Sequence, residues 1–226
     1  AKYIDDVYYH ADGGGYTEKG FSQLFTLDAN GGNAQQLTND NFNNGGEVSF
    51  SKDGKTLYFS ANRNENNELK PTNTELYQLD LDSLAIFPLT ERNGPDQQPK
   101  VSPDGKYLAY TGYDDKRTNY ENTQLYIRDL KTGNTHSLTT DFDRSVGQIK
   151  WSANSKGLYF SYADEGQTAL AYQPRSGKRK VITEQIGSVA SDPDEILTRF
   201  DISENGDIAF TLADTQRPAD VATIKR

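Results

Sequence analysis

Cysteine and methionine are both missing from the 226 residues, and histidine occurs only twice. Without cysteine the chain can form no disulfide, no thiol nucleophile and no zinc–cysteine site. The two histidines, His10 and His136, are far apart in the sequence, and such a pair does not indicate a transition-metal site. We therefore expect no cofactor. A complete gene product begins with methionine, so we interpret the sequence as a processed or cut fragment.

Basic charge and long apolar runs are also scarce. The net charge is −9 at pH 7, and binding phosphates needs a basic face, so we expect no nucleic-acid partner. No apolar run is long enough to span a bilayer, and the first residues lack the apolar core of a signal peptide, so we expect no membrane span. The compartment stays open between cytoplasm and periplasm, because both tolerate cysteine-free proteins.

The nucleophile motif of α/β-hydrolases, Gly-x-Ser-x-Gly, is missing as well. Of the 19 glycines only Gly20 has a serine two places on, Ser22, and the last motif position is then Leu24. His10 ends a predicted strand beside a glycine run, and His136 lies in a predicted outer strand, so neither has a catalytic setting. We expect no catalytic residue in this chain.

Aromatic residues, in contrast, are plentiful, with 14 Tyr and 10 Phe, and such residues suit half-buried strands. A repeat accompanies them. Ser51, Ser102, Ser152 and Ser203 each begin a polar turn between two apolar segments, at spacings of 51, 50 and 51 residues. Asp or Asn two places on tolerates turn geometry, and the Gly that follows in most copies supplies positive φ, so each copy predicts a hairpin.

Each hairpin leads through a polar loop to a third strand and then to a fourth strand ending in Leu-Thr or Ile-Thr. The third strands begin at Leu24, Leu76, Leu125 and Leu170, and the residue before the closing threonine follows 13, 13, 13 and 12 positions later. Four short antiparallel strands at this period are typical of β-propeller blades, whereas a β-sandwich does not repeat its turns at fixed intervals. We predict an all-β fold, a β-propeller of four-stranded antiparallel blades, with about five blades present of which the first and last are incomplete.

The predicted partial propeller occupies residues 1–226. Its approximate blades are 1–38, 47–90, 98–139, 146–183 and 197–226. The first unit begins near Tyr3–His10 on its second strand, and the last ends at Asp220–Lys225 on its third strand. Exposed edges at both ends would allow edge-to-edge self-association of the fragment. Only Ile186–Thr198 could hold a helical turn.

The loops between second and third strands are long and should emerge on the same face as the inter-blade connectors. These loops are Ala11–Ser22, Asn62–Thr74 and Gly112–Thr123. Aromatic and arginine side chains are frequent there, as they are on protein docking surfaces. Ordinary surface loops without a binding role explain this composition equally well. The residues that we predict to face a substrate or a hydrolase domain are Phe42, Tyr113, Arg117, Phe142 and Arg144.

One connector, 39–45, faintly resembles a calcium loop with alternating oxygen ligands. It has fewer acidic residues than such a loop, and its glycine is not at the required position. Its counterpart at 140–144 occupies the same inter-blade position, which favours a structural role for both.

Several segments, in order, resemble the propeller of prolyl-oligopeptidase-family serine peptidases, in particular the bacterial acylaminoacyl-peptidase and dipeptidyl-peptidase branch. They are 9–16 (Tyr-His-Ala-Asp-Gly-Gly-Gly-Tyr), 23–28 (Gln-Leu-Phe-Thr-Leu-Asp), 36–38 (Gln-Leu-Thr) and 50–54 (Phe-Ser-Lys-Asp-Gly). The Ser-Pro-Asp-Gly unit at 102–105 is shared more widely, including by the periplasmic propeller protein TolB.

This resemblance implies a non-catalytic, substrate-gating propeller portion of a peptidase that hydrolyses peptides or acyl-peptides. It implies a C-terminal α/β-hydrolase domain of the same parent chain as partner. That domain carries the Ser-Asp-His triad, so no triad residue can be assigned here, and 217–221 resembles the last propeller strand before it. The alternative is a free-standing TolB-like periplasmic propeller for protein–protein interaction. A propeller lyase acting on sugars would need clustered histidines and metal ligands, which are scarce.

Overall fold

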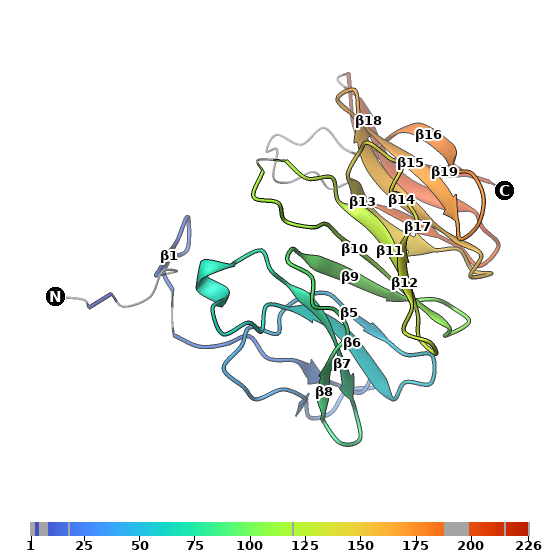
Figure 1. Cartoon of the computed structure of the whole chain (residues 1–226). Coiled ribbons are helices and arrows are strands. Elements are labelled where there is room, and N and C mark those ends of the chain that lie inside the picture. The colour runs from blue at the N-terminus through green and yellow to red at the C-terminus, as the bar shows by residue number, and fades with distance from the viewer. Residues whose placement is uncertain are drawn as a thin grey trace.

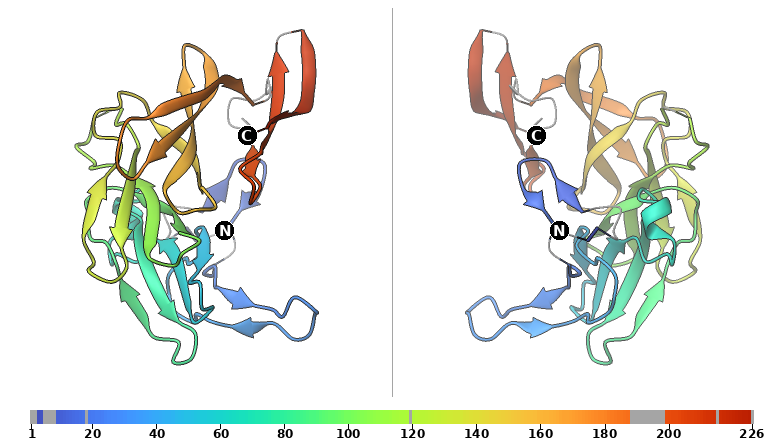
Figure 2. Two further views of the ribbon diagram at one scale, coloured as in Figure 1. Left: turned by 90° about the vertical axis from the view of Figure 1, so that its right-hand side faces the viewer. Right: turned by 90° about the vertical axis from the view of Figure 1, so that its left-hand side faces the viewer.

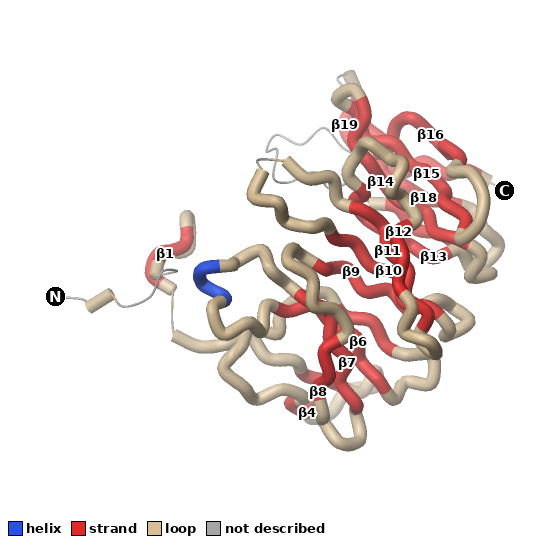
Figure 3. The backbone as a smooth tube through the Cα atoms, in the orientation of Figure 1, coloured by secondary structure: helices blue, strands red, loops and turns tan. Residues whose placement is uncertain are grey.

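The computed structural model describes residues 3–4, 9–17, 19–118, 120–187, 199–214 and 216–225. Within this part of the chain the regular structure is almost all strand, and its one helical element is the short 3-10 helix η1 (Asn67–Leu69) (Figure 3). The expectation that only 186–198 could hold a helical turn was therefore wrong, because the long loop 62–74 closes one such turn by backbone hydrogen bonds. The predicted all-β fold is confirmed.

Three four-stranded antiparallel sheets form the middle of the molecule (Figure 1). In each of them the strands pair in chain order, so every sheet is one continuous stretch of sequence. The first sheet consists of β5 (Val48–Phe50), β6 (Thr56–Ala61), β7 (Glu75–Asp80) and β8 (Ile86–Pro88). The second consists of β9 (Asp96–Val101), β10 (Tyr107–Gly112), β11 (Gln124–Asp129) and β12 (Thr135–Ser137). The third consists of β13 (Val146–Trp151), β14 (Gly157–Asp164), β15 (Gln167–Pro174) and β16 (Lys180–Ile186).

Smaller sheets lie before and after these three, and they agree with the prediction of incomplete first and last blades. Near the C-terminus, β17 (Phe200–Ile202), β18 (Ile208–Asp214) and β19 (Arg217–Ile224) form a three-stranded sheet. Near the N-terminus, β3 (Phe25–Thr26) pairs with β4 (Gln35–Gln36), and β1 (His10–Ala11) pairs with β2 (Gly15–Tyr16). The expected second strand near Tyr3–His10 falls mostly outside the described residues. The candidate helical turn over 186–198 also lies outside them, except that Ile186 ends β16 and Gly187 forms a parallel bridge with Leu212.

The sheets stand side by side in an open arc, as blades do around an axis (Figure 2). Apolar side chains from each pair of neighbouring sheets fill the space between them. Leu76 and Leu108 share one buried cluster, Leu125 and Phe160 another, and Leu170 and Phe210 a third. The hydrophobic core is therefore a series of seams between blades rather than one central volume.

The repeated turn is held together by its serine hydroxyl. Ser51 Oγ donates to Asp53 Oδ1 at 2.6 Å and accepts the backbone N–H of Thr56 at 2.9 Å. Gly54 follows with φ of 70°, the left-handed conformation that the motif predicts. The third copy has Ser155 at the glycine position, with φ of 58°, and its hydroxyl accepts the N–H of Asp104 from the preceding blade at 3.0 Å. This serine therefore links two blades at a place where glycine could not.

The closing threonine of each blade also has a defined contact. The hydroxyls of Thr38, Thr90 and Thr139 accept the backbone N–H of Leu24, Leu76 and Leu125, each at 2.9 Å. Each of these hydrogen bonds joins the start of the third strand to the end of the fourth. They explain why the third-strand leucine and the closing threonine keep a constant spacing in the sequence. In the next blade the pairing of β15 with β16 shifts register around Leu170 and Thr183. The Thr183 hydroxyl there donates to the Gln185 carbonyl instead, at 3.3 Å.

Candidate functional site

The inter-blade connectors and the loops between second and third strands lie on one face, as predicted; we call it the connector face. Asp115 N donates to the Asn93 carbonyl at 2.7 Å, and Asn93 Nδ2 donates to the Asp115 carbonyl at 3.0 Å. Asn122 Nδ2 donates to Asp143 Oδ1 at 2.9 Å in the same way one blade later. Each connector is therefore hydrogen-bonded to a long loop beside it.

The five predicted facing residues have different surroundings on this face. Arg117 is exposed, has φ of 58°, and its N–H donates to Asp115 Oδ1 at 2.7 Å. Arg144 is also exposed and pairs with Asp164 at 2.9 Å. Tyr113 is half-buried, while Phe42 and Phe142 lie partly beneath arginine side chains. Two of the five are thus exposed at the surface, and the two phenylalanines are each covered by an arginine.

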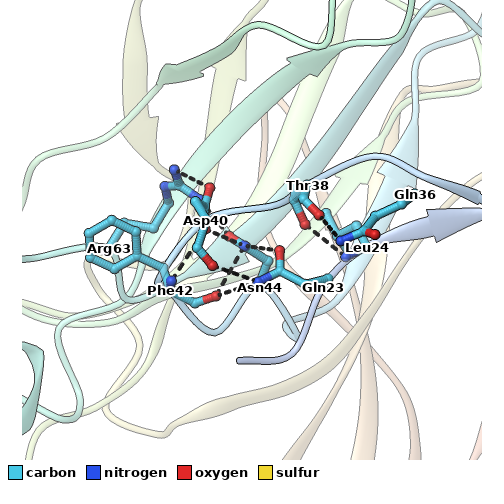
Figure 4. Close-up of polar contacts among 8 residues, drawn as sticks. All are labelled: Gln23, Leu24, Gln36, Thr38, Asp40, Phe42, Asn44 and Arg63. Carbon is cyan, nitrogen blue, oxygen red and sulfur yellow. Dashed lines mark hydrogen bonds and ion pairs between the residues drawn. The ribbon is translucent and has the colours of Figure 1, made fainter. Parts of the chain in front are cut away.

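The connector that resembles a calcium loop is closed by an arginine (Figure 4). Arg63 pairs with Asp40 at 2.8 Å and donates to Asn44 Oδ1 at 2.6 Å, while its guanidinium lies 5.0 Å from the centre of the Phe42 ring. Asn44 is wholly buried, and its Nδ2 donates to Asp40 Oδ1 at 3.0 Å and to Gln23 Oε1 at 3.3 Å. Burial acts to raise the pKa of Asp40, but hydrogen bonds from Asn44 and Arg63 outweigh it and the pKa is lowered. The oxygens of this connector are turned toward one another and toward Arg63, which fits a structural role.

The next seam contains two buried carboxyl groups and one guanidinium; we call Glu75, Arg92 and Asp96 the buried acid cluster. Glu75 is 5% exposed and Asp96 is 0% exposed, and both lie next to Arg92 in the connector between the first two four-stranded sheets. Arg92 pairs with Asp96 through Nη2 and Oδ1, and its guanidinium lies 4.0 Å from the centre of the Tyr126 ring. Asp96 Oδ2 has no hydrogen-bond partner among the described residues.

Burial dominates the ionisation of these acids. It raises the pKa of Glu75 to about 7, against an opposing hydrogen bond that Thr90 Oγ1 donates at 2.5 Å. Burial likewise raises the pKa of Asp96 to about 6, although the positive charge of Arg92 acts to lower it. With both acids ionised, two carboxylates would lie beside one guanidinium and leave an excess negative charge. The buried acid cluster is therefore most stable when one of the two acids keeps its proton.

Gly112, at the end of β10, has no side chain, and the Asp96 carboxylate occupies the space that a side chain there would fill. A Cβ at position 112 would overlap the Asp96 carboxylate and the Pro95 carbonyl oxygen. We expect Gly112→Ala to lower the free energy of unfolding by about 2 kcal/mol, measured by urea denaturation. Gly20→Ala is the control, because a Cβ there meets no atom within 4 Å, and it should change stability by less than about 0.5 kcal/mol. Equal effects of the two substitutions would contradict this packing.

A third arginine–aromatic contact lies one blade further on. The Arg179 guanidinium lies 3.9 Å from the centre of the Phe142 ring, and Arg179 Nη1 is 3.6 Å from Asp141 Oδ1. Phe142 in turn packs edge-on against Phe160 and Tyr162. In all three seams an arginine covers an aromatic ring beside an acid that lies in the connector or begins the strand after it, which is a stabilising arrangement for a partly desolvated cation.

Two hollows open at the end of the inner strands that lies on the connector face. The larger has a volume of about 1080 Å³ and is bounded by Thr17, the segment 19–22, the connector 43–47, the end of β6, the loop that carries η1, and the start of β9. The smaller, of about 770 Å³, lies along β9, β13, β17 and β18. Glu47 and Gln98 line both hollows, so the two adjoin along the inner strands.

The described residues do not assemble a catalytic or metal-binding group. His10 lies in the exposed β1–β2 hairpin with its ring 5.9 Å from that of Tyr16, and His136 is exposed in β12. Ser22 N donates to Asn43 Oδ1 in a loop, with no helix following. Nowhere in the same residues do three or more histidine or carboxylate side chains cluster so that they could hold a metal ion. Nor does any helix within the described ranges reach the length and apolar character that crossing a bilayer requires.

Sequence comparison assigns a family to this arrangement of blades. The profile of the TolB beta propeller domain, PD40, matches residues 15–193, which is most of the chain. The chain belongs to the TolB-type β-propeller family. The prediction of a propeller with this repeat is confirmed.

Among curated proteins, this propeller is similar to dipeptidyl-peptidase 5. It is 32% identical over 143 residues to the protein of Porphyromonas gingivalis, which covers 61% of this chain and 21% of the relative. With dipeptidyl-peptidase 5 of Trichophyton equinum it is 28% identical over 166 residues, covering 66% and 23%. The chain thus spans about a fifth to a quarter of the length of these relatives. The resemblance to a propeller of the prolyl-oligopeptidase family is supported by these matches.

Solved structures share the fold at lower identity. TolB from Acinetobacter baumannii superposes with a TM-score of 0.64 at 23% identity, covering 89% of this propeller and 45% of that chain. A puromycin-hydrolyzing peptidase of Mycobacterium tuberculosis also gives a TM-score of 0.64, at 14% identity, covering 91% and 34%. At these identities the structures support the propeller fold alone.

Proposed function

We propose that this propeller is the non-catalytic, substrate-gating portion of a serine peptidase that hydrolyses peptides or acyl-peptides. The observation that carries the proposal is the similarity to dipeptidyl-peptidase 5 over 143 residues at 32% identity, in a chain that covers only 21% of that relative. The partner is an α/β-hydrolase domain of the same parent protein, and the connector face with its two hollows is the surface turned toward that domain and toward peptide substrates. Arg117, Arg144 and Tyr113 contact the partner or the substrate, while Phe42 and Phe142 support the face from within the seams.

The test compares this chain with the parent protein that contains it. The isolated chain should release no product from dipeptidyl or acyl-aminoacyl chromogenic substrates, because it lacks a nucleophile elbow. The parent protein should turn them over and should lose that activity when treated with a serine-directed fluorophosphonate. A parent protein that neither cleaves these substrates nor reacts with the fluorophosphonate would refute the proposal.

A second candidate is a free-standing propeller that binds proteins in the periplasm. It is favoured by the TolB-type family profile and by the superposition on TolB of A. baumannii. The reading frame around this chain separates the two candidates: a downstream hydrolase domain favours the peptidase, and an upstream export signal without such a domain favours the interaction protein.

A further inference from the structure

The larger hollow of the connector face has a lining of unusual composition. Among its side chains, uncharged carboxamides outnumber every charged type, and small residues such as Gly46 and Ala61 also line it. The carboxamides are Asn43, Asn62, Asn67, Gln97 and Gln98. Asn43 Oδ1 already accepts the N–H of Ser22, and Asn62 already bonds to Lys70 and Asn64. The carboxamide atoms that remain, chiefly those of Gln97 and Gln98, offer donors and acceptors to a ligand that presents both in alternation.

The hollow has few charged side chains: Lys19, Glu47 and Glu68 are the charged residues of its lining. Glu47 pairs with Lys100 of the next blade at 2.6 Å, so its carboxylate is already engaged. Glu68 lies at the rim on η1, where it is exposed. A site of this kind favours an uncharged polar ligand over a phosphate or a sugar acid, since either anion would need several cations converging on it and Lys19 is the one cationic residue of the described lining.

Gln98 occupies the boundary between the two hollows in a strained conformation. Its φ is 55°, which is uncommon for a residue other than glycine, and the pairing of β9 with β10 shifts register beside it. Its Nε2 donates to the Gly147 carbonyl of the next inner strand at 3.3 Å, which holds the carboxamide between two blades. Strained residues of this kind persist where the surroundings fix them, and they cluster at ligand sites.

The same level carries a polar side chain in, or just before, each of the four described inner strands, β5, β9, β13 and β17. Glu47, Gln98, Gln148 and Arg199 each lie three residues before the end of an inner strand, and all four line the smaller hollow. Gln148 Oε1 is buried and has no hydrogen-bond partner among the described residues. This buried acceptor belongs to a residue that lines the smaller hollow.

We propose that the larger hollow binds an extended, uncharged stretch of polypeptide through its main chain, with Gln97 and Gln98 as the principal contacts. An extended main chain presents alternating N–H and C=O groups, which match the carboxamide lining, and the hollow's volume of about 1080 Å³ accommodates several residues. The inference rests on the proposed peptidase function and goes beyond it: recognition is of the peptide interior and tolerates different sequences, rather than of a charged terminus.

The test uses the 226-residue chain and two pentapeptides of alanine, serine and glycine. One probe is blocked by N-acetyl and C-amide groups, and the other has a free N-terminal amine. Titration followed by NMR or calorimetry should give both probes the same dissociation constant within twofold, on the order of 0.1–1 mM. Gln98→Gly with Gln97→Ala should weaken both about tenfold or more, because two carboxamide contacts are removed. Glycine accepts φ of 55°, so this variant should keep its fold, as checked by its urea midpoint.

Matched controls decide the outcome. Gln35→Ala removes an exposed carboxamide from β4, outside the hollow, and should leave both dissociation constants unchanged. Glu68→Gln should also leave them unchanged; a loss confined to the free-amine probe would show amine recognition and overturn the main-chain proposal. Undetectable binding of the blocked probe at 10 mM, or equal binding by the Gln97/Gln98 variant, would overturn it too. If the chain binds the blocked probe but its parent protein has no peptidase activity, the proposed function is refuted. The proposed peptide-binding site is not.

Discussion

Replacing Arg92 by methionine should lower the free energy of unfolding by about 3–5 kcal/mol, because it leaves the buried carboxyl groups of Asp96 and Glu75 without their cation. Asp96 is 0% exposed and one of its oxygens already lacks a partner, so no solvent is available to replace the guanidinium. The substitution also removes the cation that lies 4.0 Å from the Tyr126 ring centre. Urea denaturation measures the effect, and the fluorescence of Trp151, the single tryptophan, follows the transition.

Two further variants separate the charge effect from lost packing. Adding Asp96→Asn and Glu75→Gln to Arg92→Met should restore part of the lost stability, because no uncompensated charge then stays buried. Arg144→Met is the matched control: the pair it breaks with Asp164 is 46% and 43% exposed, and it should cost less than about 1 kcal/mol. If Arg92→Met were as mild as Arg144→Met, the buried acid cluster would not hold the charges assigned to it.

The same cluster should make the protein more stable at pH 5 than at pH 8. Glu75 has a pKa raised to about 7 by burial, against an ordinary value of 4.5. Between these values the folded chain holds a proton that the unfolded chain has lost, so the free energy of unfolding falls as the pH rises through this window. For Glu75 alone the decrease is on the order of 3 kcal/mol. Asp96, whose pKa is raised from 3.8 to about 6, contributes in the same direction at lower pH.

Urea midpoints measured from pH 4.5 to pH 8 test this dependence. Glu75→Gln should flatten most of the slope, since the amide stays neutral throughout and its oxygen can still accept the Thr90 hydroxyl. Glu68→Gln changes an exposed carboxylate outside the cluster and should leave the slope as it is. A stability that rises from pH 5 to pH 8, or a slope insensitive to Glu75→Gln, would contradict the assignment.

The repeated elements of the fold were predictable because local chemistry determines them. The serine turns at 51, 102, 152 and 203 need particular residues for their dihedral angles and hydrogen bonds, so their spacing gives the blades directly. The closing threonines could be recognised as a sequence pattern. The pattern did not predict that their hydroxyls accept a backbone N–H of the third strand. That bond joins residues 14 positions apart, and only the sheet pairing brings them together.

The arginine seams were not predicted because their members come from unrelated positions. Arg63 lies in a loop, Arg92 in a connector and Arg179 in the turn before β16, so no single spacing connects them. A weak signal did exist for the buried acids. Glu75 stands where the other blades have Gln23, Gln124 and Ala169, one place before the third-strand leucine. A carboxyl group at a position that is otherwise uncharged marks a site whose burial must alter its ionisation.

Because each four-stranded sheet consists of consecutive strands, and each sheet packs mainly on its neighbours in the chain, this propeller is close to a one-dimensional array. Its total stability is then approximately a sum of single-blade terms and seam terms, as in other repeat proteins. Contacts within a blade join residues that are close together in the sequence. They can therefore form as soon as about fifty residues have left the ribosome, before the following blade has been synthesised. Damage to one seam should therefore loosen the blades on either side of it while the rest of the arc keeps its structure.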